Sequence, residues 1–227
     1  NIGLMALEEH FSKELLEIQQ RREGVIVRFD EEFFWADRVF DNYKIAKITP
    51  FRSGKVARSI KLSSDLAIAK SLLKSFVRGH LKPSEVFDTN LMGKFIAVAD
   101  VWGSSHVLRW PNMRYYINPI TALLEPIGFD AHLHKEEIDV PYALEEPIVS
   151  AILASDPAIK SIYQRTLERL ANEMEEDNTE KWFRTLAKKQ MKILHKEFPF
   201  LAGFPFERIA KRAKEVLTLS QSSTQNY

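Results

Sequence analysis

The stretch from Asp100 to His134 reads DVWGSSHVLRWPNMRYYINPITALLEPIGFDAHLH, and it predicts a helix end, a polar loop and a β-hairpin. MRYYI and LLEPIG are the two expected strands, and the Asn-Pro pair at the start of residues 118–121 marks the turn between them. His106 and Asn112 lie in the loop before the hairpin, and Asp130 follows its second strand. The pattern predicts that an amide, a carboxylate and an imidazole come to one end of a small sheet.

Asn112 and Asp130 are the first candidate site. Their side chains carry hard oxygen ligands, which a divalent cation holding phosphates prefers, because it binds few protein groups and keeps several waters. The alternative is that these polar side chains only cap turns of the hairpin. Both interpretations stay open on the residues alone.

Composition narrows the class of protein. The chain has 227 residues, 45% of them hydrophobic and 28% charged, which is typical of a globular fold. Its net charge of +1 gives no overall attraction to nucleic acid, which we do not expect as a partner. Cysteine is absent, so disulfides, thiolate catalysis and cysteine-bound zinc are excluded. No apolar run approaches the length of a membrane span, and no signal peptide is visible.

The order of predicted elements indicates an α+β fold. Short strands are expected near the N-terminus, over residues 2–7, 25–29 and 45–51, with a helix capped by Ser12 after the first. Later helices are predicted to start at Ser64 and at Asn90, and four more lie beyond residue 147.

From this order we expect a small antiparallel N-terminal sheet followed by a mainly helical C-terminal lobe with an embedded hairpin. The expected boundaries are a partial β-rich lobe over 1–60, a helical lobe over 61–219 with the hairpin at 113–129, and a flexible tail over 220–227.

Glu8 and Arg28 form a second candidate pair. Glu8 lies at the exit of the first expected strand, and Arg28 alternates with Val27 on the second, so the two side chains can share a face. A cross-strand ion pair and a role in binding a ligand are equally open for them.

Four segments carry a resemblance to a known family. They read GLMALEEHFSKELLE, FDTNLMGKFIAVADVWG, PNMRYYINPITALLEPIGFD and IVSAILASDPAIKSIYQRTLERL. In order and in several residues they resemble the core of the bacterial spore-coat CotH family, over most of residues 1–170.

CotH proteins are atypical protein kinases with a distant kinase-like fold. The resemblance implies that Asn112 and Asp130 bind Mg²⁺ or Mn²⁺, that Glu8 and Arg28 contact ATP, and that a phosphoryl group passes to a protein substrate. It also implies an extracytoplasmic or cell-surface location. In phosphoryl transfer a protein supplies metal ligands and positioning more than covalent chemistry, which agrees with these residue types.

Two departures bear on catalysis. The loop over residues 103–111 lacks the acid that the family uses as a base, and His106 stands nearest to that place. A histidine can act as a base near neutral pH, or it can simply bond the backbone. The strands that precede residue 2 in a kinase lobe are also missing, which suggests a piece of a longer protein.

Two rival functions remain. A degenerate kinase-like module would bind a nucleotide or a protein partner without catalysis. A metal-dependent hydrolase would use His132 and His134, which share a face if extended and lie close to Asp130 in sequence.

Overall fold

The computed structural model describes residues 11–32, 42–131, 140–203 and 205–222. The chain forms two compact units. The first comprises residues 1–92 and 109–130, and the second comprises residues 93–108 and 131–227.

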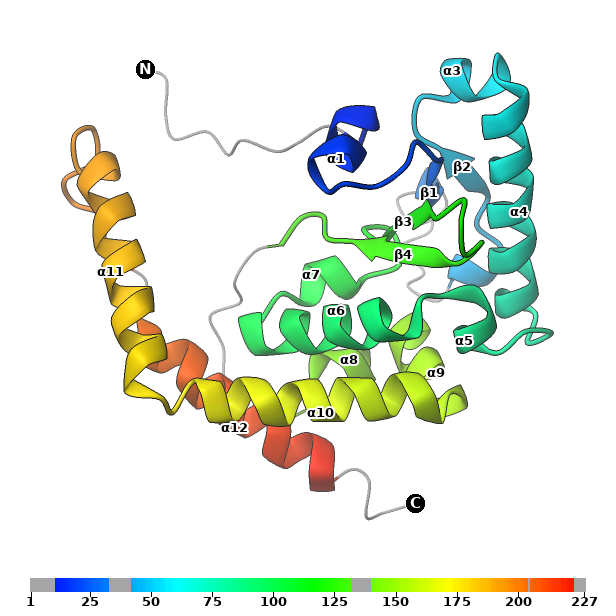
Figure 1. Cartoon of the computed structure of the whole chain (residues 1–227). Coiled ribbons are helices and arrows are strands. Elements are labelled where there is room, and N and C mark those ends of the chain that lie inside the picture. Colours follow the sequence, from blue (N-terminus) through cyan, green and yellow to red (C-terminus); the bar gives the residue numbers. More distant parts are fainter. Residues whose placement is uncertain (1–10, 33–41, 132–139, 204, 223–227) are drawn as a thin grey trace. The chain divides into compact units, whose positions relative to one another are not determined.

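A four-stranded antiparallel sheet forms the centre of the first unit (Figure 1). The strand order is β2-β1-β3-β4, with bounds of Ile48–Pro50, Ile26–Phe29, Arg114–Ile117 and Leu124–Ile127 respectively. The β3–β4 hairpin forms where the sequence predicts it, but its place in the fold differs from the expectation. Because β3 pairs with β1, the hairpin extends the N-terminal sheet instead of lying within a helical lobe.

Helices and a turn of 3-10 helix surround this sheet. Their bounds are α1 (Lys13–Ile18), η1 (Asn42–Lys44), α3 (Ser53–Ala57), α4 (Ile60–Val77) and α5 (Pro83–Val86). The predicted start of α4 at Ser64 is wrong. The Oγ of Ser59 accepts a hydrogen bond from the backbone N of Leu62 at 3.3 Å, so the cap lies five residues earlier and Ser64 is inside the helix.

The core of the first unit is aromatic. Every residue of β3 is buried, so this strand has no solvent-facing side. On one face, the ring of Tyr115 lies 5.3 Å from that of Phe87 and 6.4 Å from that of Phe29. On the other face, Tyr116 packs with Leu16 of α1, and its hydroxyl donates to the carbonyl of Arg22 at 2.7 Å. The β3 strand therefore holds the unit together from within.

One long helix, α6 (Thr89–Trp102), begins in the first unit and ends in the second. Asn90 does not cap it as predicted. Asp88 does, since its Oδ1 accepts a hydrogen bond from the backbone N of Leu91 at 2.9 Å.

In its described residues the second unit is helical. Besides the end of α6 it contains α7 (Ser105–Leu108), α8 (Tyr142–Glu145), α9 (Pro147–Ser155), α10 (Pro157–Glu173), α11 (Asp177–Leu194) and α12 (Phe206–Ser222). Asp156 caps α10, and α10 and α12 pack along each other. The helix α12 extends three residues into the segment expected to be a flexible tail. A search of the described helices finds none with the length and apolarity needed to cross a bilayer.

Candidate functional site

Asn112 and Asp130 lie together at one end of the sheet. Asn112 comes two residues before β3, and Asp130 comes three residues after β4. The antiparallel register places Arg114 opposite Ile127, so the chain segments just outside these strand ends meet. The amide Nδ2 of Asn112 donates to Oδ2 of Asp130 at 3.1 Å. The hairpin thus brings an amide and a carboxylate side by side.

The backbone of Asp130 is left-handed, with a φ of 57°. Aspartate tolerates this region better than most residues, because its short polar side chain can bond locally. The turn therefore fixes the direction of the side chain, and the hydrogen bond from Asn112 fixes its rotation.

Two arginines occupy directly opposite positions on β1 and β3. Arg28 is the register partner of Arg114, so two positive charges face each other across the strands. Like charges in this position destabilise a sheet unless another charge compensates them. Glu31 compensates in part, because its Oε1 lies 3.1 Å from Nη1 of Arg28, with both side chains about one-third exposed.

Aromatic rings surround the guanidinium of Arg114. Its Cζ lies 4.5 Å from the ring centre of Phe129, 5.5 Å from that of Phe51 and 5.9 Å from that of Phe11. The Cζ of Arg28 lies 5.3 Å from the same Phe51 ring. Ring faces attract cations, so this cluster stabilises a charge that water cannot reach.

The electrostatics of Arg114 follow from its burial. The residue is 2% exposed, and its Nε is buried without a hydrogen-bond partner. Burial, with the charge of Arg28 as the next cause, lowers the pKa of Arg114 to about 10, while Glu31 and Asp130 act in the opposite direction. Arg114 remains protonated at neutral pH and places a fixed positive charge near Asp130.

A basic groove runs along β2 on the side of Arg28. The residues that line it include Arg28, Thr49, Arg52, Lys55 and Arg58, with Asp30 as the acidic member. Among the described strands β2 lies at the edge of the sheet, and no other described strand covers this side.

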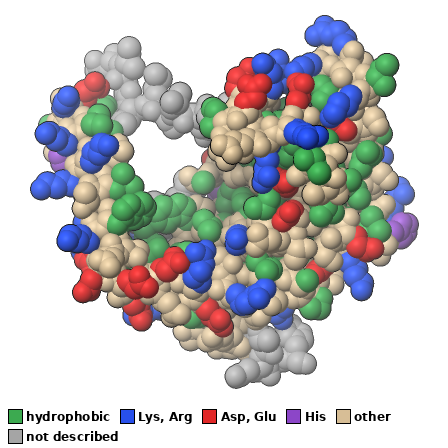
Figure 2. All heavy atoms as spheres, viewed as in Figure 1, with side chains coloured by type: hydrophobic (Ala, Val, Ile, Leu, Met, Phe, Trp, Pro, Cys, Tyr) green, Lys and Arg blue, Asp and Glu red, His purple; other side chains and the backbone are tan. Residues whose placement is uncertain are grey.

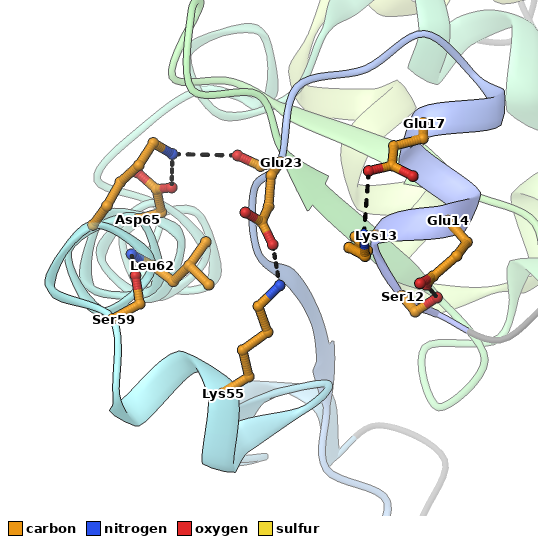
Figure 3. Close-up of polar contacts among 10 residues, drawn as sticks. Ser12, Lys13, Glu14, Glu17, Glu23, Lys55, Ser59, Leu62 and Asp65 are labelled. Atoms are coloured by element: carbon orange, nitrogen blue, oxygen red, sulfur yellow. Dashed lines mark hydrogen bonds and ion pairs between the residues drawn. The ribbon is translucent and has the colours of Figure 1, made fainter.

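A polar network holds α3, and with it the groove, against the rest of the unit (Figure 3). Glu23, in the segment before β1, forms an ion pair with Lys55 of α3. Lys61 of α4 donates to the backbone carbonyl of Glu23 at 3.2 Å and to Oδ2 of Asp65 at 2.7 Å. Lys55 is therefore held by a carboxylate, whereas Arg52 and Arg58 form no ion pair within the described residues.

The other predicted site residues are distributed differently. Glu8, His132 and His134 lie outside the described residues. His106 is half-buried on α7 and belongs to the second unit. Within the first unit the structure brings Asn112 and Asp130 into contact. Arg28 lies opposite Arg114 on the neighbouring strand, and the charge of Arg114 in turn acts on Asp130.

The donor set suits a hard cation that keeps much of its water. In the described part of the chain there is no group of three or more histidine, cysteine or acidic side chains arranged to hold a metal. The amide oxygen of Asn112 and the carboxylate of Asp130 would supply two protein ligands. Mg²⁺ is bound in this way in many phosphate sites, with water and phosphate oxygens completing its shell.

A second buried polar cluster lies around Asp100 in the second unit. Asp100 is fully buried, and its carboxylate accepts hydrogen bonds from the hydroxyl of Tyr163 at 2.8 Å and from the backbone N of Ala143 at 3.2 Å. Nε of Arg212 donates to the Asp100 carbonyl at 2.7 Å. Burial raises the pKa of Asp100 to about 6, against the effect of these hydrogen bonds and of Arg212. The chain itself supplies these partners, which indicates a structural role.

Sequence reasoning missed Arg114 and its aromatic neighbours. One signal was present, since an arginine within the apolar run MRYYI needs a reason to be buried. The rings of Phe11, Phe51 and Phe129 come from three distant segments, and no local pattern joins them.

Comparisons with protein-family models, with curated proteins and with solved structures find no match for this chain. The candidate site is defined by its own geometry.

Proposed function

We propose that the first unit binds the phosphates of ATP together with Mg²⁺ or Mn²⁺, as part of a CotH-like kinase domain that transfers phosphoryl groups to a protein. The observation that carries this proposal is the contact between Asn112 and Asp130 at the end of the hairpin. An amide and a carboxylate at this place are what the resemblance to the family requires of the two metal ligands.

The positive charges nearby support the same proposal. Arg28 is partly exposed and can approach an anion, whereas Arg114 is buried and contributes only its field. Phosphoryl transfer depends on positioning and on neutralising phosphate charge. A bound cation would supply a further part of that neutralisation.

A second candidate is a module that binds the nucleotide without transferring phosphate. The loop over residues 103–111 favours it, because that loop contains no aspartate or glutamate. His106 is the residue there that could replace the missing base, and its half-buried position on α7 also suits a structural role.

Calorimetric titration with ATP, with and without Mn²⁺, tests the binding. The whole chain should bind ATP only with the metal. Asp130→Asn should weaken binding by more than about tenfold, because even changes to residues that only support the metal ligands weaken metal binding by about 10- to 100-fold. Asp177→Asn is the matched control, because it removes the same charge from an exposed position on α11. Asp130→Asn protein that melts normally and binds Mn-ATP with unchanged affinity would contradict the assignment.

Transfer is measured separately, as incorporation of the γ-phosphate into a generic acceptor protein. Incorporation that falls in His106→Ala supports a kinase with a histidine base. Metal-dependent binding without any incorporation supports the second candidate.

A further inference from the structure

The helix α11 carries an apolar surface that the described residues of the chain leave uncovered. None of its 18 residues is buried. The side chains of Trp182, Leu186 and Ile193 are 64%, 42% and 57% exposed. The three lie at intervals of four and seven residues, so they form one strip along the helix. Large apolar side chains that lie together on an exposed surface are typical of an interaction site.

Positive charge is concentrated on the same helix and on the two residues that follow it. Residues 181–196 contain six lysines and arginines and no acidic residue, in a chain whose net charge is only +1. Arg184 forms ion pairs with Glu180 at 2.6 Å and with Glu207 of α12. Within the described residues, the five lysines form no ion pair: Lys181, Lys188, Lys189, Lys192 and Lys196.

Apolar and basic side chains occupy adjoining faces of α11. Figure 2 shows basic side chains along this helix with hydrophobic side chains beside them. Lys189 lies between Leu186 and Ile193 at helical spacing, and Lys196 follows just after the helix end, so charged groups adjoin the apolar side chains. Lysine stems can lie along apolar surface while the ammonium groups remain in water.

Only one flank of the apolar face is free. The ring of Phe183 lies 5.4 Å from that of Phe206 on α12, and Phe183, Ala187 and Leu194 are half-buried. A protein partner that encloses a helix in a groove would also need the flank that carries Phe183, which is already packed against α12. A flat partner needs only the strip that is exposed.

We propose that α11 binds the surface of an anionic lipid bilayer, lying in the interface with Trp182, Leu186 and Ile193 inserted and its lysines on the headgroups. Charge complementarity selects this occupant, because five lysines that form no ion pair with any described residue lie in or beside the strip. Basic amphipathic helices bind such surfaces through buried apolar area plus attraction to anionic lipids. A second copy of the chain would bring two lysine-rich faces together, which the charges oppose.

The segment after α11 also carries an exposed aromatic side chain. Phe200 is 79% exposed, and its ring lies 6.2 Å from that of Phe198. Phenylalanine is one of the residues that insert from amphipathic helices into the boundary of headgroups and acyl chains, so an exposed ring here would add to the inserted area.

Cosedimentation of the whole chain with lipid vesicles tests the proposal. We expect binding to vesicles of equal parts phosphatidylcholine and phosphatidylglycerol, and little binding to pure phosphatidylcholine. The triple variant K188Q/K189Q/K192Q should weaken binding roughly a hundredfold, since each lysine near an anionic surface contributes about 1 kcal/mol. The double variant L186S/I193S should also weaken binding while keeping every charge.

The matched control is K44Q/K74Q/K94Q, which removes three exposed lysines from other elements and gives the same net charge. It should bind the anionic vesicles as the unchanged chain does, and circular dichroism should show all variants folded. Equal loss in the control variant, or equal binding to both vesicle types, would overturn the proposal. So would self-association that L186S/I193S abolishes, or binding to an acidic polypeptide without binding to vesicles.

Discussion

In the described part of each unit, one buried arginine has a nitrogen without a hydrogen-bond partner, but the two arginines are held in different ways. Arg212 is 8% exposed, with Nη2 unpartnered, and Arg114 is 2% exposed, with Nε unpartnered. Arg212 donates to the Asp100 carbonyl, lies near the Asp100 carboxylate and stacks on Tyr142 at 4.5 Å. Arg114 donates to the carbonyl of Pro111 and is surrounded by rings.

The difference lies in the neighbouring charge. The nearest partner of Arg212 is an aspartate that three segments of the same unit enclose, so its charge is compensated from within. The register partner of Arg114 is another arginine, and Arg114 forms no ion pair within the described residues. A buried cation next to a second, partly exposed cation stores electrostatic cost that an external anion would relieve. This contrast supports the proposal that the first unit binds a ligand, whereas the buried charges of the second unit support its fold.

Arg212→Met should produce the largest loss of stability. The change leaves the Asp100 carbonyl and carboxylate without their buried cation, and breaking such an arrangement costs about 3–5 kcal/mol. Gly103 adds to the constraint, because its φ is 70° and any Cβ there would lie 3.1 Å from Nε of Arg212. Urea denaturation of both chains measures the loss. A cost below about 1 kcal/mol would show that Arg212 is as weakly held as Arg114.

The next effect is a pH dependence that comes from Asp100. Its pKa is raised to about 6 in the folded state, so the folded chain binds the proton more tightly than the unfolded chain does. The free energy of unfolding therefore includes a contribution from Asp100 that is fully present at low pH. This contribution, about 3 kcal/mol in total, is lost as the pH rises through about 6.

Asp100→Asn isolates this contribution, because the amide does not titrate. Stability of both proteins is compared by urea denaturation from about pH 4 to about pH 7, where other groups titrate equally in both. The advantage of the unchanged chain over the variant should shrink as pH rises. A constant difference across this range would mean that Asp100 keeps an ordinary pKa.

The sequence predicted the local parts of the first unit well. Asn118 and Pro119 marked the hairpin turn, and the hairpin register then brought Asn112 and Asp130 together, because strand ends that pair must meet. These features depend on residues close in sequence. The pairing of β1 with β3 crosses more than eighty residues, and no local signal specifies it. The hairpin was therefore assigned to a helical lobe when it belongs to the sheet.

The starts of α4 and α6 were predicted at the wrong residues for a related reason. Ser59 and Ser64 both precede apolar residues at helical spacing, and only the fold decides which of them caps the start of the helix. The Asp100 cluster was beyond prediction in the same way, since Tyr163 and Arg212 approach it from α10 and α12.

The smallest expected effect concerns the two arginines of the sheet, and it tests the comparison most directly. Arg114→Met should cost about 1 kcal/mol or less, because the lost hydrogen bond to Pro111 and the lost ring contacts are offset by relief of the repulsion from Arg28 and of the cost of burying a charge. Arg28→Met relieves the same repulsion, so each single variant gains it, but the double variant gains it only once. The double variant should thus lose more stability than the sum of the two single variants, by about 0.5 kcal/mol.

Urea denaturation of the four chains supplies the cycle, and Arg21→Met, which removes a cation from the pair with Glu125, serves as the control for loss of charge. A double variant that loses less than the sum would mean that the two arginines support each other. Arg114 would then be a structural cation like Arg212, and the sheet would hold no uncompensated charge for an anion to relieve.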